Sequence, residues 1–159
     1  DTPAFGGVYK LAAETDDNGQ WIPKIKLSNN PEKITLPGVK KVYRIYDKAT
    51  GKIKADQICL ADEILDENTE LVLFDEEATW KQMHLKPGTY TVRDLLVPIF
   101  VNGECVYQSP KTMEIRDYAQ QELSTLWDEH RRLNNPHTGP VDLSLALYEL
   151  KQKMIQTWK

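Results

Sequence analysis

The feature that most constrains the fold is a change in the periodicity of the apolar residues about two thirds of the way along the chain. Before residue 109, short runs rich in β-branched and aromatic residues alternate with clusters of Asp, Asn and Gly. After that point, apolar residues recur every three or four positions. The first pattern is typical of strands and hairpins, and the second of amphipathic helices. We therefore predict an α+β fold, with mostly antiparallel strands and hairpins followed by two C-terminal helices packed on them.

The turn residues delimit the expected strands. These strands cover residues 6–14, 21–28, 40–47, 52–63, 70–74 and the two arms of 93–108. Asn102-Gly103 favours a type I′ turn between the last two arms, and Gly51 can supply the positive φ of an earlier hairpin. Pro98 is expected at an edge, because it cannot donate to a ladder.

The last third predicts two helices. The first starts near Ser109-Pro110 or at Thr112 and runs about six turns. Its packing face comprises Ile115, Ala119, Leu123, Leu126, Trp127, His130 and Leu133. "NNPHTGP", residues 134–140, ends it. The second helix starts near Ser144, with Leu147, Leu150, Met154 and Trp158 on one face. The short connection favours a helical hairpin.

This pattern predicts the domain organisation. A β-rich portion, 1–108, is expected to precede a C-terminal helical hairpin, 109–159, within one structural unit. The chain begins with Asp, and either a mature protein or a fragment of a larger chain could begin in this way.

Composition excludes several classes of protein. The chain has 159 residues and a formal net charge of −4, which argues against generic nucleic-acid binding. No apolar run approaches the roughly 18 residues of a membrane-spanning helix. Cys59 and Cys105 are too few and too far apart for a zinc knuckle or a disulfide framework. We expect both to be reduced and buried in a cytosolic protein.

Charge is unevenly distributed along the chain. Residues 24–54 hold nine Lys or Arg and two acidic residues, whereas residues 55–80 hold nine acidic residues and no basic one. The basic stretch could face an anionic ligand. It could equally face its acidic neighbour across adjacent strands, where opposite charges attract.

Motifs for catalysis are absent from the sequence. There is no nucleophile motif, and Gly6-Gly7 precedes an expected strand instead of linking a strand to a helix, as a phosphate loop would. The paired carboxylates of residues 62–63 and 75–77 lack histidine neighbours, so we predict no metal site. His84, His130 and His137 each have a structural explanation, and we assign none of them a catalytic role.

One basic surface remains as a candidate binding site. Lys24 and Lys26 would share one face of an extended strand, with Ile25 and Leu27 on the other, and Lys10 could point the same way. Three ammonium groups there could face an anion or simply form the solvated side of a sheet. The residue pattern leaves both interpretations open.

Several long strings resemble a known family. They are "GGVYKLAA", "PKIKLSNNPEKITLPGVKKVYRIYD", "LLVPIFVNGECVYQSP", "EIRDYAQQELSTLWDEHRRLNNP" and "PVDLS". In this order they resemble the C-terminal segment, roughly the last third, of nicotinate phosphoribosyltransferases. The resemblance covers nearly the whole chain.

The resemblance implies a function for the full-length protein. Enzymes of this family join nicotinate to phosphoribosyl pyrophosphate, giving nicotinate mononucleotide and pyrophosphate with ATP hydrolysis. ATP and magnesium are therefore expected for the full enzyme, and no cofactor for this segment. The expected partners are the N-terminal barrel part of the same enzyme and a second subunit, in the cytoplasm. No nucleic acid or membrane partner is implied.

The resemblance also places the catalytic groups upstream of this chain, so we expect the isolated segment to be inactive. No histidine here lies in the context of the family's catalytic histidine. Lys10, Lys26 and Ser28 are expected to lie next to the substrate. The alternative is an autonomous β-plus-helix module that binds a partner or a small anion through the basic strand surface of Lys10, Lys24 and Lys26.

Overall fold

The computed structural model describes residues 6–157, which form two compact units. The larger unit is Lys41–Ser144, and the smaller one combines the described residues on either side of it. Strands and helices are present in the proportions of an α+β fold, as predicted. The division at residues 108 and 109 stays a prediction, since the compact units follow another boundary.

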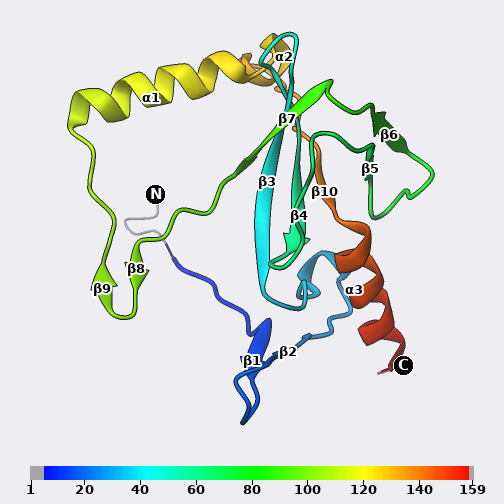
Figure 1. Cartoon of the computed structure of the whole chain (residues 1–159). Helices are drawn as coiled ribbons and strands as arrows, with labels where there is room; N and C mark the ends of the chain where they lie inside the picture. Colours follow the sequence, from blue (N-terminus) through cyan, green and yellow to red (C-terminus); the bar gives the residue numbers. More distant parts are fainter. Residues whose placement is uncertain (1–5, 158–159) are drawn as a thin grey trace. The chain divides into compact units, whose positions relative to one another are not determined.

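The larger unit is built on a four-stranded sheet (Figure 1). Its strands, in spatial order, are β10 (Val141–Leu143), β4 (Ile53–Leu60), β3 (Lys40–Asp47) and β7 (Tyr90–Asp94). Strand β7 runs antiparallel to β3, whereas β10 runs parallel to β4. The sequence analysis missed β10, because its three residues follow Pro140 in a segment that reads as a connection.

A tight turn joins β3 to β4. Gly51 has a φ of 68°, as the turn requires. The Asp47 carboxylate accepts hydrogen bonds from the N–H groups of Ala49 and Thr50 and pairs with Lys54 at 2.9 Å. These contacts lower the pKa of Asp47 to about 2.

A second hairpin completes the core. Strands β5 (Leu71–Phe74) and β6 (Gln82–Leu85) pair antiparallel. The core consists of Ile45, Ala55, Leu71, Leu73, Leu85 and Tyr90. The buried Tyr90 keeps its hydroxyl satisfied by donating to the carbonyls of Asp66 and Thr69, at 2.9 and 3.1 Å.

The predicted turn at Asn102-Gly103 is confirmed. Asn102 and Gly103 have φ values of 50° and 83°, and they join β8 (Phe100–Val101) to β9 (Glu104–Cys105). The strands are much shorter than the expected arms. Cys105 is exposed here, so the expectation that both cysteines are buried is wrong. Cys59 is fully buried, and its burial raises the pKa of the thiol to about 12.

The long first helix was predicted wrongly. It is divided into α1 (Thr112–Thr125) and α2 (Asp128–Arg131), with extended backbone at Leu126 and Trp127. The Trp127 indole N–H donates to the carbonyl of Ile53 at 2.7 Å, and the Lys52 ammonium binds the carbonyls of Ser124 and Leu126. These contacts with β4 and the turn before it satisfy the helix end and outweigh the regular apolar pattern.

The start and the packing face of α1 also differ from the prediction. Lys111 is the N-cap, and the Glu114 carboxylate accepts its backbone N–H at 2.7 Å, whereas Ser109 and Thr112 do not cap. No residue of α1 is buried. Ile115 is 52% exposed, and Leu133, beyond α2, is 99% exposed. The expected packing face is therefore open in the described chain.

Charge holds α1 to the sheet. Glu122 of α1 receives two hydrogen bonds from the Arg93 guanidinium, at 2.8 and 2.6 Å, and lies 3.6 Å from Arg44. Arg44 also forms a bidentate pair with Asp56 across β3 and β4. This pair links the basic stretch to its acidic neighbour, as one of the two interpretations of the charge distribution expected.

The smaller unit contains two short strands and a helix. Its elements are β1 (Ala13–Thr15), β2 (Trp21–Pro23), the 3₁₀ turn Pro31–Lys33 and α3 (Leu145–Thr157). The expected strands 6–14 and 21–28 shrink to three residues each. The hydrogen bonding between the two segments continues one residue beyond Pro23, where the Lys24 N–H donates to the carbonyl of Ala12. Helix α3 begins one residue after its predicted start.

The prediction that a short loop joins the two C-terminal helices as a hairpin is wrong. Strand β10 lies between α2 and α3, so residues 134–144 are not a simple loop. Leu147 of the predicted α3 face is fully buried, and Trp158 lies outside the described residues. Within residues 6–157 no helix is long and apolar enough to cross a membrane.

The core generates a first prediction. Ile45→Ala removes a side chain with no exposed surface, and we expect it to lower the free energy of unfolding by about 2–5 kcal/mol. Ile64→Ala is the matched control, because Ile64 is 83% exposed and its truncation should cost less than about 0.5 kcal/mol. Urea unfolding measures both. Equal losses would contradict the assignment of this core.

The ion pairs of Glu122 generate a second prediction. The Arg93 guanidinium lowers the pKa of Glu122 in the folded protein. The resulting stabilisation is present above the unfolded pKa of about 4.3 and is lost as the pH falls through the lower folded value.

We therefore expect the hydrogen-exchange protection factors of the α1 amides, which are corrected for the intrinsic rate at each pH, to fall on acidification below about pH 4 in the unmodified chain. Glu122→Gln should lower these protection factors already at neutral pH and make them less dependent on pH. Asp117→Asn, an exposed change on the same helix, is the control and should leave the profile unchanged. Identical profiles for Glu122→Gln and the unmodified chain would rule out this role.

Candidate functional site: a lysine-lined groove

A groove in the smaller unit brings together all three residues expected next to a substrate. It has a volume of about 820 Å³. Its polar lining comprises Lys10, Lys24, Lys26, Ser28 and Lys33, and its apolar lining comprises Val8, Tyr9, Leu11, Ile25 and Leu27. We call it the lysine groove.

Backbone hydrogen bonds position the two walls. Strands β1 and β2 pair through three residues each, and the N–H of Lys24 then donates to the carbonyl of Ala12 at 2.8 Å. Beyond this bond the two segments lie outside any strand. The N–H of Thr35 binds the carbonyl of Lys26 at 3.2 Å, which ties the second wall to the chain after the 3₁₀ turn.

The lysines differ in their partners. Lys24 forms an ion pair with Glu14 at 2.5 Å, so its charge is compensated. The Lys10 ammonium donates to the carbonyl of Lys33 at 2.9 Å and keeps its net charge. In the described part of the chain, neither a hydrogen bond nor an ion pair reaches the Lys26 ammonium. Ser28 accepts the N–H of Asn30 at 3.2 Å, which leaves its hydroxyl hydrogen available to donate.

The expected division into a basic and an apolar strand face is wrong. Lys24 and Lys26 line the groove together with Ile25 and Leu27, because residues 24–28 are not in a strand. The alternative of a basic strand surface therefore loses its geometric basis. Sequence reasoning also missed Lys33 and Tyr9. The sequence Asn30-Pro31 is a typical start of a helical turn and could have indicated the 3₁₀ turn that contains Lys33. In this turn the Asn30 side-chain oxygen accepts the N–H of Glu32 at 3.0 Å.

The chemistry of the groove suits an anion with an apolar part. Ammonium and hydroxyl donors can bind phosphate oxygens, and the apolar side chains can contact an apolar part of the ligand. No acid–base pair lines the groove, so it can bind and orient a ligand, but it offers no group for a chemical step.

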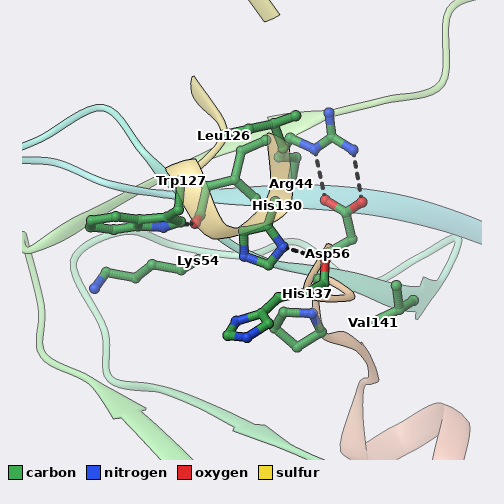
Figure 2. A pocket seen from close by; sticks show the side chains of 11 residues that line it. Arg44, Lys54, Asp56, Leu126, Trp127, His130, His137 and Val141 are labelled. Atoms are coloured by element: carbon green, nitrogen blue, oxygen red, sulfur yellow. Dashed lines mark hydrogen bonds and ion pairs between the residues drawn. The ribbon is translucent and has the colours of Figure 1, made fainter. Parts of the chain in front are cut away.

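A second hollow lies in the larger unit and contains two of the three histidines. Its volume is about 310 Å³, and its walls include Arg44, Asp56, Trp127, His130 and His137 (Figure 2). Figure 2 shows the bidentate pair of Arg44 and Asp56 beside it.

The histidine contacts in this hollow are structural. His130 Nδ1 lies 2.8 Å from the carbonyl oxygen of His137, and the rings stand edge to face with centroids 6.2 Å apart (Figure 2). Because a carbonyl only accepts, Nδ1 of His130 carries the proton. The contact bridges α2 and the segment before β10. His84 is elsewhere, on β6, with its Nδ1 2.9 Å from the Glu70 carboxylate. No three His, Cys, Asp or Glu side chains among residues 6–157 are grouped as metal ligands.

Comparison with known proteins shows what the chain resembles. Residues 39–151 match the family model of the nicotinate phosphoribosyltransferase C-terminal domain. A nicotinate phosphoribosyltransferase of Bacillus subtilis (strain 168) is 38% identical over 159 residues, which are 100% of this chain and 32% of that protein. One of Homo sapiens is 36% identical over 151 residues, which are 93% of this chain and 26% of that protein.

A solved structure agrees with the sequence comparison. The crystal structure of human nicotinic acid phosphoribosyltransferase superposes with a TM-score of 0.67 at 29% identity, covering 76% of this chain and 24% of the human chain. The chain thus spans about a third or less of the length of these relatives. It belongs to the family of nicotinate phosphoribosyltransferase C-terminal domains.

Proposed function

We propose that this chain serves as the C-terminal part of an enzyme that joins nicotinate to phosphoribosyl pyrophosphate, giving nicotinate mononucleotide and pyrophosphate. The observation that carries the proposal is the family match over residues 39–151. The relative from Bacillus subtilis supports it, because its similarity extends over the full length of this chain. In this role the segment supplies no catalytic group of its own.

Open apolar surfaces support a role within a larger protein. On α1, Met113, Ile115 and Tyr118 are 58%, 52% and 56% exposed, and Phe100 of β8 is 68% exposed. Exposed apolar surface of this kind marks an interface. In our proposal the preceding barrel part of the enzyme and a second subunit of a homodimer are the partners.

The cofactors of the reaction belong to the full-length enzyme in this proposal. We assign ATP and its magnesium to the barrel part, as the family resemblance implies. The free thiols of Cys59 and Cys105 suit a reducing compartment, and we place the enzyme in the cytoplasm.

The lysine groove is the part of this segment that we assign to the substrate side. Lys26 has no partner within the described chain, and Lys10 retains its charge while donating one hydrogen bond. The Ser28 hydroxyl can add a neutral donor. Together they suit phosphate oxygens, either of phosphoribosyl pyrophosphate or of the released pyrophosphate.

A reconstitution assay tests the proposed function. Formation of nicotinate mononucleotide is measured for this chain alone and for the chain joined to the barrel part that precedes it in its relatives. We expect turnover only from the joined protein. Turnover by this chain alone, or a joined protein that folds and uses another base instead of nicotinate, would overturn the proposal.

Substitutions in the full-length enzyme test the groove separately. Lys26→Ala and Lys10→Ala should raise the KM for phosphoribosyl pyrophosphate by about 10- to 100-fold, because each removes a charge-assisted hydrogen bond. The KM for nicotinate should change much less. Lys24→Ala is the matched control, since Glu14 already compensates that charge. Equal effects at all three lysines would show that only general charge matters, and an active enzyme with unchanged KM values would remove the groove from the substrate site.

A further inference from the structure

The buried carboxylate of Asp142 has no role in the proposed function. Asp142 lies in the middle of β10, and only 9% of its surface is exposed. Within residues 6–157, no hydrogen bond or ion pair reaches its side chain. A carboxylate that is largely withdrawn from bulk water and has no protein partner is costly, and a cation in the hollow that Asp142 lines would compensate its charge.

The surroundings of Asp142 are strongly acidic. It lines a hollow of about 320 Å³ together with Asp75, Glu76, Glu77, Pro140 and Val141, and no basic residue is among the lining residues. Burial and the nearby charge of Asp75 raise the pKa of Asp142. Lys81 lines the adjoining hollow of about 270 Å³, but within residues 6–157 it forms no ion pair with either aspartate.

Well-defined elements hold both aspartates. Strand β10 is hydrogen bonded to β4, with Asp142 opposite Gln57. Asp75 directly follows β5, and its turn is closed by backbone bonds from Ala78 to Asp75 and from Lys81 to Ala78, at 3.2 and 2.7 Å. One Asp75 oxygen accepts the N–H of Glu77 at 2.9 Å, which orients the carboxylate and leaves its second oxygen for a ligand.

We propose that this hollow binds a hydrated magnesium ion, with Asp142 and Asp75 as its carboxylate ligands. The donors are oxygens, which suit a hard cation. In the described residues three acidic or histidine side chains do not converge, so the six to eight protein oxygens of a calcium cage and the nitrogen and sulfur ligands of zinc are not provided. Magnesium retains several waters and commonly uses only one or two carboxylates.

Binding would join two parts of the larger unit. The ion links β10, at the edge of the four-stranded sheet, to the turn after β5 in the neighbouring hairpin. Because the unfolded chain does not bring these aspartates together, the ion stabilises the folded state by mass action. This site is independent of the lysine groove and of the proposed reaction.

Two measurements on this chain test the proposal. Isothermal titration with MgCl₂ detects binding, and thermal unfolding is followed in MgCl₂ and in NaCl of equal ionic strength. We expect a single site and a midpoint that rises with MgCl₂ but not with NaCl. Asp142→Asn and Asp75→Asn should each weaken magnesium binding by on the order of tenfold or more, because the affinity depends on the number of charged ligands.

The unfolding temperatures of the variants also distinguish a metal ligand from an aspartate that only stabilises the fold. Without magnesium, Asp142→Asn should unfold at a higher temperature than the unmodified chain, because the buried charge is removed, and its midpoint should no longer respond to MgCl₂. Glu104→Gln, an exposed carboxylate of β9, is the control and should keep the full response. Asp75→Asn gives the same test of binding if Asp142→Asn does not fold.

Three results of the measurements on this chain would overturn the proposal. They are equal responses to MgCl₂ and NaCl, an undiminished response in both aspartate variants, and a larger shift with CaCl₂ than with MgCl₂. Pairing of Asp142 with a basic side chain of the preceding part of the enzyme would also exclude the ion. It would appear as loss of magnesium binding when the two parts are joined.

Discussion

The hairpin of β3 and β4 is the constraint on which the larger unit depends. Asp47 begins the turn with three hydrogen bonds to its carboxylate, and Gly51 supplies the left-handed residue. This turn sets the pairing of two eight-residue strands, each of which has a further strand on its other side. The placement of β7, β10 and the Arg44–Asp56 pair then follows. Ion pairs of Glu122 with Arg44 and Arg93 in turn hold helix α1 against this sheet.

Local chemistry was predictable from the sequence, and contacts between distant segments were not. The turns at Gly51 and Asn102-Gly103 depend on positive φ values, which the residue types indicate directly. The break after Thr125 depends on Lys52 and Ile53, more than 70 positions away. Strand β10 is equally nonlocal, because only its pairing with β4 makes it a strand. Apolar residues do recur at helical spacing over residues 115–133. Periodicity alone, however, does not show which other part of a protein covers the apolar face of a helix.

The candidate site, too, was predictable in its residues but not in its geometry. Lys10, Lys26 and Ser28 were singled out from a family resemblance, and the structure places them in one groove, although not on the strand that was expected. The error concerned the two faces of the expected strand, because alternation was assumed for residues 24–28, which lie beyond the last residue pair of β1 and β2. Their contact with substrate stays a proposal. Asp142 gave no signal in the sequence, since a carboxylate in a short strand segment usually faces solvent.

The two unpaired charges differ in what they imply. Lys26 is exposed, so water compensates its ammonium and the absence of a protein partner costs almost nothing. Its importance therefore depends on the groove and on the family, and not on its missing partner. Asp142 is buried beside another carboxylate, so the same absence has a substantial electrostatic cost that a ligand can relieve. Burial, more than charge, thus decides which of the two residues is itself evidence for a bound ion.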